Sequence, residues 1–112
     1  MAQVAKLLAQ GTLPTAVSTI YVCPEGKSCA FTLLLVVNID VATRGYAFYL
    51  APPTGVASGG TTLVNAATIA ANTPPVVFPV TGMILTQGFQ LFGAATAANG
   101  IAIHLFGIEY DP

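Results

Sequence analysis

The sequence predicts an all-β fold: one antiparallel β-sandwich, or jelly-roll-like domain, of seven to eight short strands over residues 1–112. Eleven glycines and eight prolines are spread along the whole chain and punctuate it with turns. Runs rich in β-branched and aromatic residues lie between them at a spacing of about 10 to 15 residues, which is typical of sandwiches and jelly rolls. The spacing of apolar residues that marks an amphipathic helix is nearly absent.

The runs define the expected strands in chain order. Residues 4–13, within the segment 1–13, are expected to be an N-terminal arm or a first edge strand, because Pro14 ends the run. Pro79 restricts the run that contains it to an edge or irregular strand. The remaining expected strands are residues 18–23, 28–38, 46–51, 61–66, 76–80, 83–85, 89–94 and 101–110.

Turn residues separate these runs. Pro24–Lys27 combines a proline with a glycine, and Asn99–Gly100 is a strong hairpin signal. Further turns or loops are expected at residues 39–45, 52–60, 86–88 and 95–100, and an alanine-rich connection at residues 67–73. Both faces of residues 28–38 are apolar at the centre of the run, as in a strand that is covered on two sides.

Charge is the most unusual feature of the composition. Only seven residues carry a full charge, whereas an average soluble domain of this length has about 28; they are Lys6, Glu25, Lys27, Asp40, Arg44, Glu109 and Asp111. Three scattered cations are too few for nucleic-acid binding. The longest apolar run stops at Asn38, short of the ~20 residues of a spanning helix. We therefore expect neighbouring protein subunits, rather than a membrane, to cover the apolar surface.

Few residues have side chains that could take part in catalysis or bind a metal. Cys23 and Cys29 flank a predicted turn; without further ligands they cannot form a zinc site, so reduced core thiols are the main interpretation and a disulfide stays open. His104 lies within a strand and is interpreted as a packed or interface histidine with one bonded nitrogen. Glu109 and Asp111 are interpreted as a solvated chain end. We expect no catalytic, cofactor-binding or metal residue, and no enzyme.

Three stretches resemble small virion structural proteins of tailed bacteriophages. They are Ser18–Lys27 with the strand ending at Asn38, the hairpin Thr81–Gly93, and the terminal strand Gly100–Glu109. Phe89 and Glu25 depart from the family pattern, which usually has aspartate and alanine there. The resemblance implies a β-sandwich on a phage particle, either as a capsid decoration (cement) protein or as a tail-associated component, and it transfers no catalytic residue.

The leading hypothesis is a non-enzymatic decoration protein of the virion, which is assembled in the host cytoplasm. Its expected partners are the major capsid protein and copies of itself, in a trimer. We expect it to bind neither nucleic acid nor a membrane. A tail or fibre module that binds a host surface glycan is the alternative, and a self-assembling surface protein unrelated to phage is another. The expected interface residues are Val4, Leu7, Leu8, Leu13, Tyr49, Phe89, Phe92, Phe106 and Tyr110.

Overall fold

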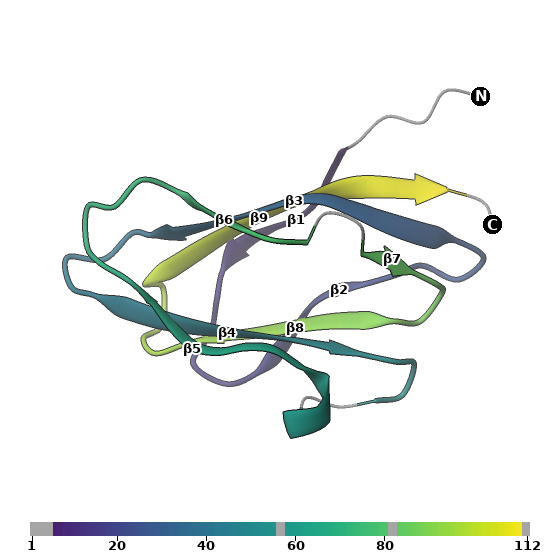
Figure 1. Ribbon diagram of the computed structural model, residues 1–112, viewed down its shortest axis with the longest axis horizontal. Coiled ribbons are helices and arrows are strands. Elements are labelled where there is room, and N and C mark those ends of the chain that lie inside the picture. The colour runs from purple at the N-terminus through teal and green to yellow at the C-terminus, as the bar shows by residue number, and fades with distance from the viewer. Residues whose placement is uncertain (1–5, 56–57, 81–82, 111–112) are drawn as a thin grey trace.

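The computed structural model describes residues 6–55, 58–80 and 83–110, which form two antiparallel sheets packed face to face as a β-sandwich (Figure 1). The described residues contain nine strands and one short 3-10 helix, Gly59–Thr61. The sequence-based expectation of seven to eight strands was therefore too low. No helix in these residues is long and apolar enough to cross a membrane.

The strands divide between an upper and a lower layer in Figure 1. We call the upper layer sheet A; it has the order β1 (Lys6–Thr12), β9 (Ile101–Tyr110), β3 (Ser28–Asn38), β6 (Val76–Phe78), with β7 (Ile84–Leu85) also paired to β3. Sheet B, the lower layer, has the order β2 (Ser18–Val22), β8 (Gln90–Ala95), β4 (Arg44–Ala51), β5 (Thr62–Ile69).

The strands pair in a nested order about the middle of the chain. The first strand pairs with the last, β2 pairs with β8, β3 pairs with β6 and β7, and β4 pairs with β5. Each of these pairs is antiparallel. The two halves of the chain therefore pair along their length, as in one long hairpin that has been folded into two layers. The pairing of β3 with β9 completes sheet A, and the pairing of β4 with β8 completes sheet B.

β6 and β7 line the same edge of β3 one after the other. β7 pairs with Cys29 and Ala30, and β6 pairs with residues 34–36. Pro79 follows the last residue of β6, and proline has no N–H to donate to a ladder. The expected strand 76–80 is consequently shorter than predicted and ends at Phe78.

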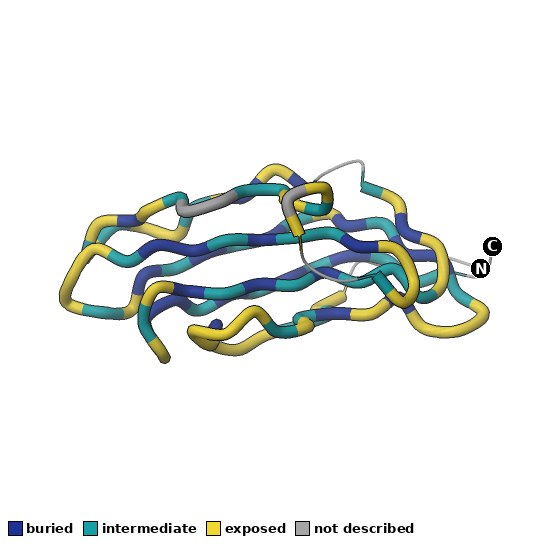
Figure 2. Tube along the Cα trace, turned by 90° about the horizontal axis from the view of Figure 1, so that it is seen from below, coloured by how far each residue is buried: buried dark blue, intermediate teal, exposed yellow. Residues whose placement is uncertain are grey.

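Side chains alternate between the interior and the outside, as the alternating colours along the strands show (Figure 2). The interior is a continuous apolar core between the sheets. Its fully buried large side chains are Leu13, Phe31, Leu34, Val36, Val80, Phe48, Leu91, Ile101 and Leu105. Phe48 of sheet B contacts Phe78 of sheet A with ring centroids 5.2 Å apart, so aromatic contacts join the two layers.

Two bulges flank the same point of β9. The register shifts between Leu7 and Ala9 on β1, and between Phe31 and Leu33 on β3. A bulge adds one residue, so the alternation reverses beyond it: β3 buries Cys29 and Phe31 before the bulge, and Leu34 and Val36 after it. Residues 28–38 therefore do not alternate simply between the two faces beyond Phe31.

Two further expectations are corrected. Residues 67–69 belong to β5 rather than to a connection, because Ile69 is a core residue and pairs with Arg44. β4 accordingly starts at Arg44, two residues before the expected start, and Arg44 and Gly45 are not part of the turn. The expected arm is an edge strand in its described part, since β1 pairs along its length with β9 of the same chain.

Gly107 of β9 lies beside the two bulges. Because it has no side chain, β1 and β3 can approach β9 closely at this point. A Cβ at this position would lie 2.6 Å from the carbonyl oxygen of Ala30 and 2.7 Å from Cδ1 of Leu8. Because one of these atoms belongs to the backbone of the central strand, the crowding cannot be relieved by a side-chain rotation alone.

We therefore expect Gly107→Ala to lower the free energy of unfolding by about 1–3 kcal/mol, the usual cost of forcing extra atoms into a packed region. Urea denaturation of the purified protein measures this loss. Gly60→Ala is the matched control, since a Cβ there has no atom within 4 Å. Equal stability of the Gly107→Ala and Gly60→Ala proteins would contradict the crowding at Gly107.

Candidate interaction surface and polar networks

The outer face of sheet A, which points away from the core, is mainly apolar across its whole width. Register pairs place its residues in rows: Leu7, Phe106 and Leu33 form one row, and Gln10, His104, Leu35 and Val77 form the next. We call the following set the outer face of sheet A: Leu7, Gln10, Thr12, Ala30, Leu33, Leu35, Val37, Val77, Ile84, Ala102, His104, Phe106, Ile108 and Tyr110.

This face carries more apolar side chains than the outward side of an antiparallel sheet usually does. The outward side of such a sheet usually carries polar residues, whereas here Gln10, Thr12, His104 and, in the bulge of β3, the exposed Thr32 stand among apolar ones. Val77 and Ile84, on the short edge strands, are 59% and 66% exposed. With four strands about 4.8 Å apart and about 3.3 Å per residue, the face covers roughly 500 Å². That is at the upper end of apolar patches on monomers.

His104 occupies the centre of this face. Its Nδ1 atom lies 3.1 Å from Nε2 of Gln10 on the neighbouring strand β1. One ring nitrogen is therefore bonded, as expected for a packed or interface histidine; which of the two His104 is stays a prediction. No group of three or more histidine, cysteine or acidic residues that could hold a metal is found in the described part of the chain.

Sheet B presents a different outer face. Its central row runs across all four strands as Thr19, Phe92, Tyr49 and Thr62, so two aromatic side chains stand side by side between two threonines. Tyr49 and Phe92, which were expected at an interface, are thus neighbours, and both are half-buried. Aromatic rings flanked by hydroxyl groups make this face more polar than the outer face of sheet A.

The remaining expected interface residues are found in several places. Leu7, Phe106 and Tyr110 belong to the outer face of sheet A. Leu8 and Phe89 are partly buried and pack against the core. Leu13 is 2% exposed and is part of the core, so its assignment to an interface was wrong: the chain turns inward at the end of β1. Val4 lies outside the described residues.

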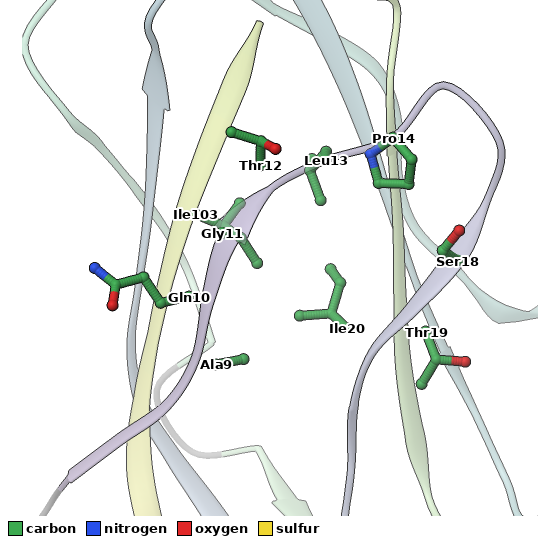
Figure 3. Close-up of a pocket in the computed structure, with 10 residues that line it drawn as sticks. All are labelled: Ala9, Gln10, Gly11, Thr12, Leu13, Pro14, Ser18, Thr19, Ile20 and Ile103. Carbon is green, nitrogen blue, oxygen red and sulfur yellow. The ribbon is translucent and has the colours of Figure 1, made fainter. Parts of the chain in front are cut away.

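A pocket of about 160 Å³ opens between β1 and β2, the edge strands of the two sheets (Figure 3). Its lining comes from residues 9–14, residues 18–20 and Ile103. The side chains that Figure 3 labels there are apolar, hydroxyl or amide groups. None of them is charged, so the pocket offers space for a small apolar side chain and no acid or base for chemistry.

A chain of hydrogen bonds runs from the surface into the core and was not expected. Lys6 Nζ lies 2.8 Å from Oε1 of Glu109, and the Tyr21 hydroxyl donates to Oε2 of Glu109 at 2.5 Å. The same hydroxyl lies 3.0 Å from Sγ of Cys29, whose sulfur lies 2.6 Å from that of Cys23. The chain crosses from β1 and β9 to β2, and so joins the two sheets.

The ionisation of this network follows from its contacts. Hydrogen bonds from Lys6 and then from Tyr21 hold the pKa of Glu109 below its usual value. Burial, followed by the contacts with Cys29 and Glu109, raises the pKa of Tyr21. Burial and the contact with Cys29 raise the pKa of Cys23 to about 12. The interpretation of Glu109 as part of a solvated chain end was therefore wrong; Asp111 lies outside the described residues.

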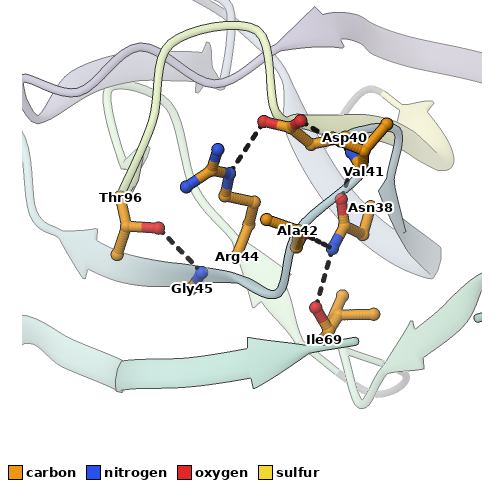
Figure 4. Close-up of polar contacts among 8 residues, drawn as sticks. All are labelled: Asn38, Asp40, Val41, Ala42, Arg44, Gly45, Ile69 and Thr96. Carbon is orange, nitrogen blue, oxygen red and sulfur yellow. Dashed lines mark hydrogen bonds and ion pairs between the residues drawn. The ribbon is translucent and has the colours of Figure 1, made fainter. Parts of the chain in front are cut away.

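A second polar network closes one end of the sandwich (Figure 4). Asn38, which is 6% exposed, donates from Nδ2 to the carbonyl oxygens of Ala42 at 2.8 Å and Ile69 at 2.7 Å. Its Oδ1 accepts from the backbone N–H of Asp40, whose carboxylate accepts from Arg44 Nε at 2.7 Å. The hydrogen bond from Arg44 lowers the pKa of Asp40. The network links β3 to β5 and holds the turn between β3 and β4 in place.

Replacing Asn38 should show how much this network stabilises the sandwich. Asn38→Ala removes both donated bonds and leaves the Ile69 carbonyl without that donor, so we expect a loss of about 2–3 kcal/mol in the free energy of unfolding. Chemical denaturation measures it. Thr43→Ala, an exposed change in the same turn, is the control. An Asn38→Ala protein as stable as this control would contradict the stabilising role.

Stability should also depend on pH through Glu109. Its pKa is lower in the folded protein than in the unfolded chain, so the unfolded chain binds more protons as the pH falls. The stabilisation is present above pH 4.5, the ordinary value, and is lost as the pH falls through the lower folded value. We expect a shallower decline of the melting temperature below pH 5 for Glu109→Gln than for the native chain or for Glu25→Gln. Equal declines in all three would contradict this role.

Comparisons with protein-family models, with curated proteins and with solved structures found no match for this chain. The resemblance to virion proteins of tailed phages therefore stays a prediction.

Proposed function

We propose that this chain is a non-enzymatic structural protein of a tailed-phage particle, a capsid decoration protein that contacts the major capsid protein and copies of itself through the outer face of sheet A. The observation that carries the proposal is the apolar character of this face over four adjacent strands. Permanent interfaces are more apolar than ordinary protein surface. A chain with seven charged residues has little other means of keeping such a face soluble.

The strand order supports the same class of protein. Eight strands that pair first with last, second with second-last and so on form a jelly roll, and here β6 and β7 would be two pieces of one interrupted strand. Jelly rolls occur in viral capsid proteins and in lectins. Because a fold alone does not define a function, this likeness supports the proposal only together with the apolar face.

The size of the face limits how it can be used. A standard interface buries about 800 Å² on each partner, and the outer face of sheet A covers roughly 500 Å². A stable contact must therefore extend beyond the face onto neighbouring loops or edge strands. Shell sites have local symmetry, so we propose a cyclic oligomer, a trimer, in which each copy contacts both the shell and the next copy.

A second candidate function rests on sheet B. The row of Thr19, Phe92, Tyr49 and Thr62 offers two aromatic rings with hydroxyl groups beside them, an arrangement that suits stacking against a sugar. A tail or fibre module that binds a host surface glycan would use this row. Binding on a glycan array that Tyr49→Ala abolishes would favour this candidate over the shell protein.

The first test is the abundance of the chain in purified phage particles. Quantitative mass spectrometry compares it with the major capsid protein. Near-stoichiometric abundance is the expected result. A few copies per particle would favour the tail or fibre candidate, and absence from the particles would overturn both.

A surface variant tests the face itself. Val77→Lys places a charge on the apolar face at a position that is already 59% exposed, so the fold should persist while attachment to undecorated shells falls at least tenfold. Val41→Lys is the matched control, because Val41 is 93% exposed on the turn after β3 and lies outside the face. Co-sedimentation with shells measures attachment. Equal attachment of the two variants would exclude this face as the docking surface.

A further inference from the structure

Cys23 and Cys29 form a buried pair at the short turn that links sheet B to sheet A between β2 and β3. Cys23 directly follows β2 of sheet B, and Cys29 is the second residue of β3 in sheet A. The side chains are 1% and 0% exposed, and the two sulfur atoms are 2.6 Å apart. A small movement of the side chains would bring them to the bonding distance of about 2.05 Å.

We infer that Cys23 and Cys29 form a disulfide when the protein meets an oxidising environment, and that this bond ties sheet B to sheet A beneath the β2–β3 turn. The inference is independent of the proposed function. Both sulfur atoms are part of the apolar core, so the bond would form without exposing a new surface.

The direction of the hydrogen bonds assigns the first reacting sulfur. The single proton of the Tyr21 hydroxyl is donated to Glu109, so the Tyr21 oxygen can only accept from the thiol of Cys29. Cys29 therefore has a hydrogen-bonded path for its proton, through Tyr21 and the partly exposed carboxylate of Glu109 to solvent. Cys23 contacts the carbonyl oxygens of Lys27 and Leu85, which cannot accept a proton permanently. Tyr21 and Glu109 are positioning residues for Cys29.

The route of the oxidant lies through the β2–β3 turn. Pro24, Glu25 and Gly26 are exposed and separate the two cysteines from solvent on that side. The turn is closed by a hydrogen bond from Lys27 N to Pro24 O at 3.2 Å, and Gly26 N donates to the side chain of Gln87 at 2.8 Å. We propose that this exposed turn opens to admit the oxidant, while the backbone bonds between Cys23 and residues 88 and 89 keep the base of the turn in place.

With oxidised glutathione, a small-molecule disulfide, the steps balance. Cys29 loses its proton to water, relayed through Tyr21 and Glu109, and its thiolate attacks one glutathione sulfur; the glutathione disulfide breaks, and the departing thiolate takes up a proton. Cys23 then loses its proton to water and attacks Sγ of Cys29, and the second glutathione leaves as a thiol. Two electrons pass from the cysteine pair to glutathione, which gives one protein disulfide and two glutathione thiols.

The test uses the complete native chain. Reduced protein is incubated with oxidised glutathione, quenched in acid, then unfolded in urea and alkylated at neutral pH, and its intact mass is measured. We expect the loss of two hydrogen atoms, no alkylation, and a melting temperature roughly 5–10 °C above that of the reduced protein. Two alkylated cysteines, a stable glutathione adduct, or a melting temperature that does not respond to oxidation would each overturn the inference.

Two variants test the cysteine pair and the proton route separately. The double variant Cys23→Ala, Cys29→Ala should have a melting temperature that oxidant and reductant leave unchanged, which assigns the shift to this pair. Tyr21→Phe keeps the ring, whose centroid lies 5.9 Å from that of Phe31, and removes the hydroxyl. We expect it to reach the same final oxidation several-fold more slowly at neutral pH, with a rate that rises more steeply with pH. A native rate and pH profile in Tyr21→Phe would overturn the proton route.

Discussion

The pairing of β3 with β9 is the constraint on which the rest of the sandwich depends. These are the longest strands, they pair over ten positions, and they form the centre of sheet A. Every other strand of that sheet pairs with one of them, since β1 adds to β9 and β6 and β7 add to β3. Sheet B then packs against the inner side of this pair, where Leu34, Ile101 and Leu105 are fully buried.

Strand content could be predicted from the sequence well, because it depends on local composition. Residues 28–38 and 101–110 coincide with β3 and β9, which are long, rich in β-branched residues and bounded by turn residues. The end of β5 was missed because alanines on both sides of Thr68 and Ile69 weaken the local strand signal; pairing with β4 keeps these residues extended. The two bulges were missed because they belong to the pairing of β1 and β3 with β9 and leave no signal in a single run of sequence.

The candidate surface was only partly predictable. Two apolar faces along residues 28–38 predicted a strand covered on two sides, whereas sheet B covers only its inner face. The neighbours of that strand on the outer face come from β1, β6 and β9, which only the register reveals. The Tyr21–Glu109 contact joins residues 88 positions apart and left no local signal. Leu13 was misplaced because an apolar residue at the end of an edge strand gives no indication of which way it points.

The place of β9 in sheet A has a consequence for how the protein is made. A ribosome releases residues 101–110 after all the other strands, yet these residues separate β1 from β3 and pair with both. Sheet A therefore cannot close before residues 101–110 have left the ribosome, and the apolar side chains of β1 and β3 lack their partner strand until then. Such long-range pairing slows folding and prolongs exposure to aggregation. A chaperone that binds β1 and β3 until residues 101–110 have left the ribosome would protect the nascent chain from aggregation.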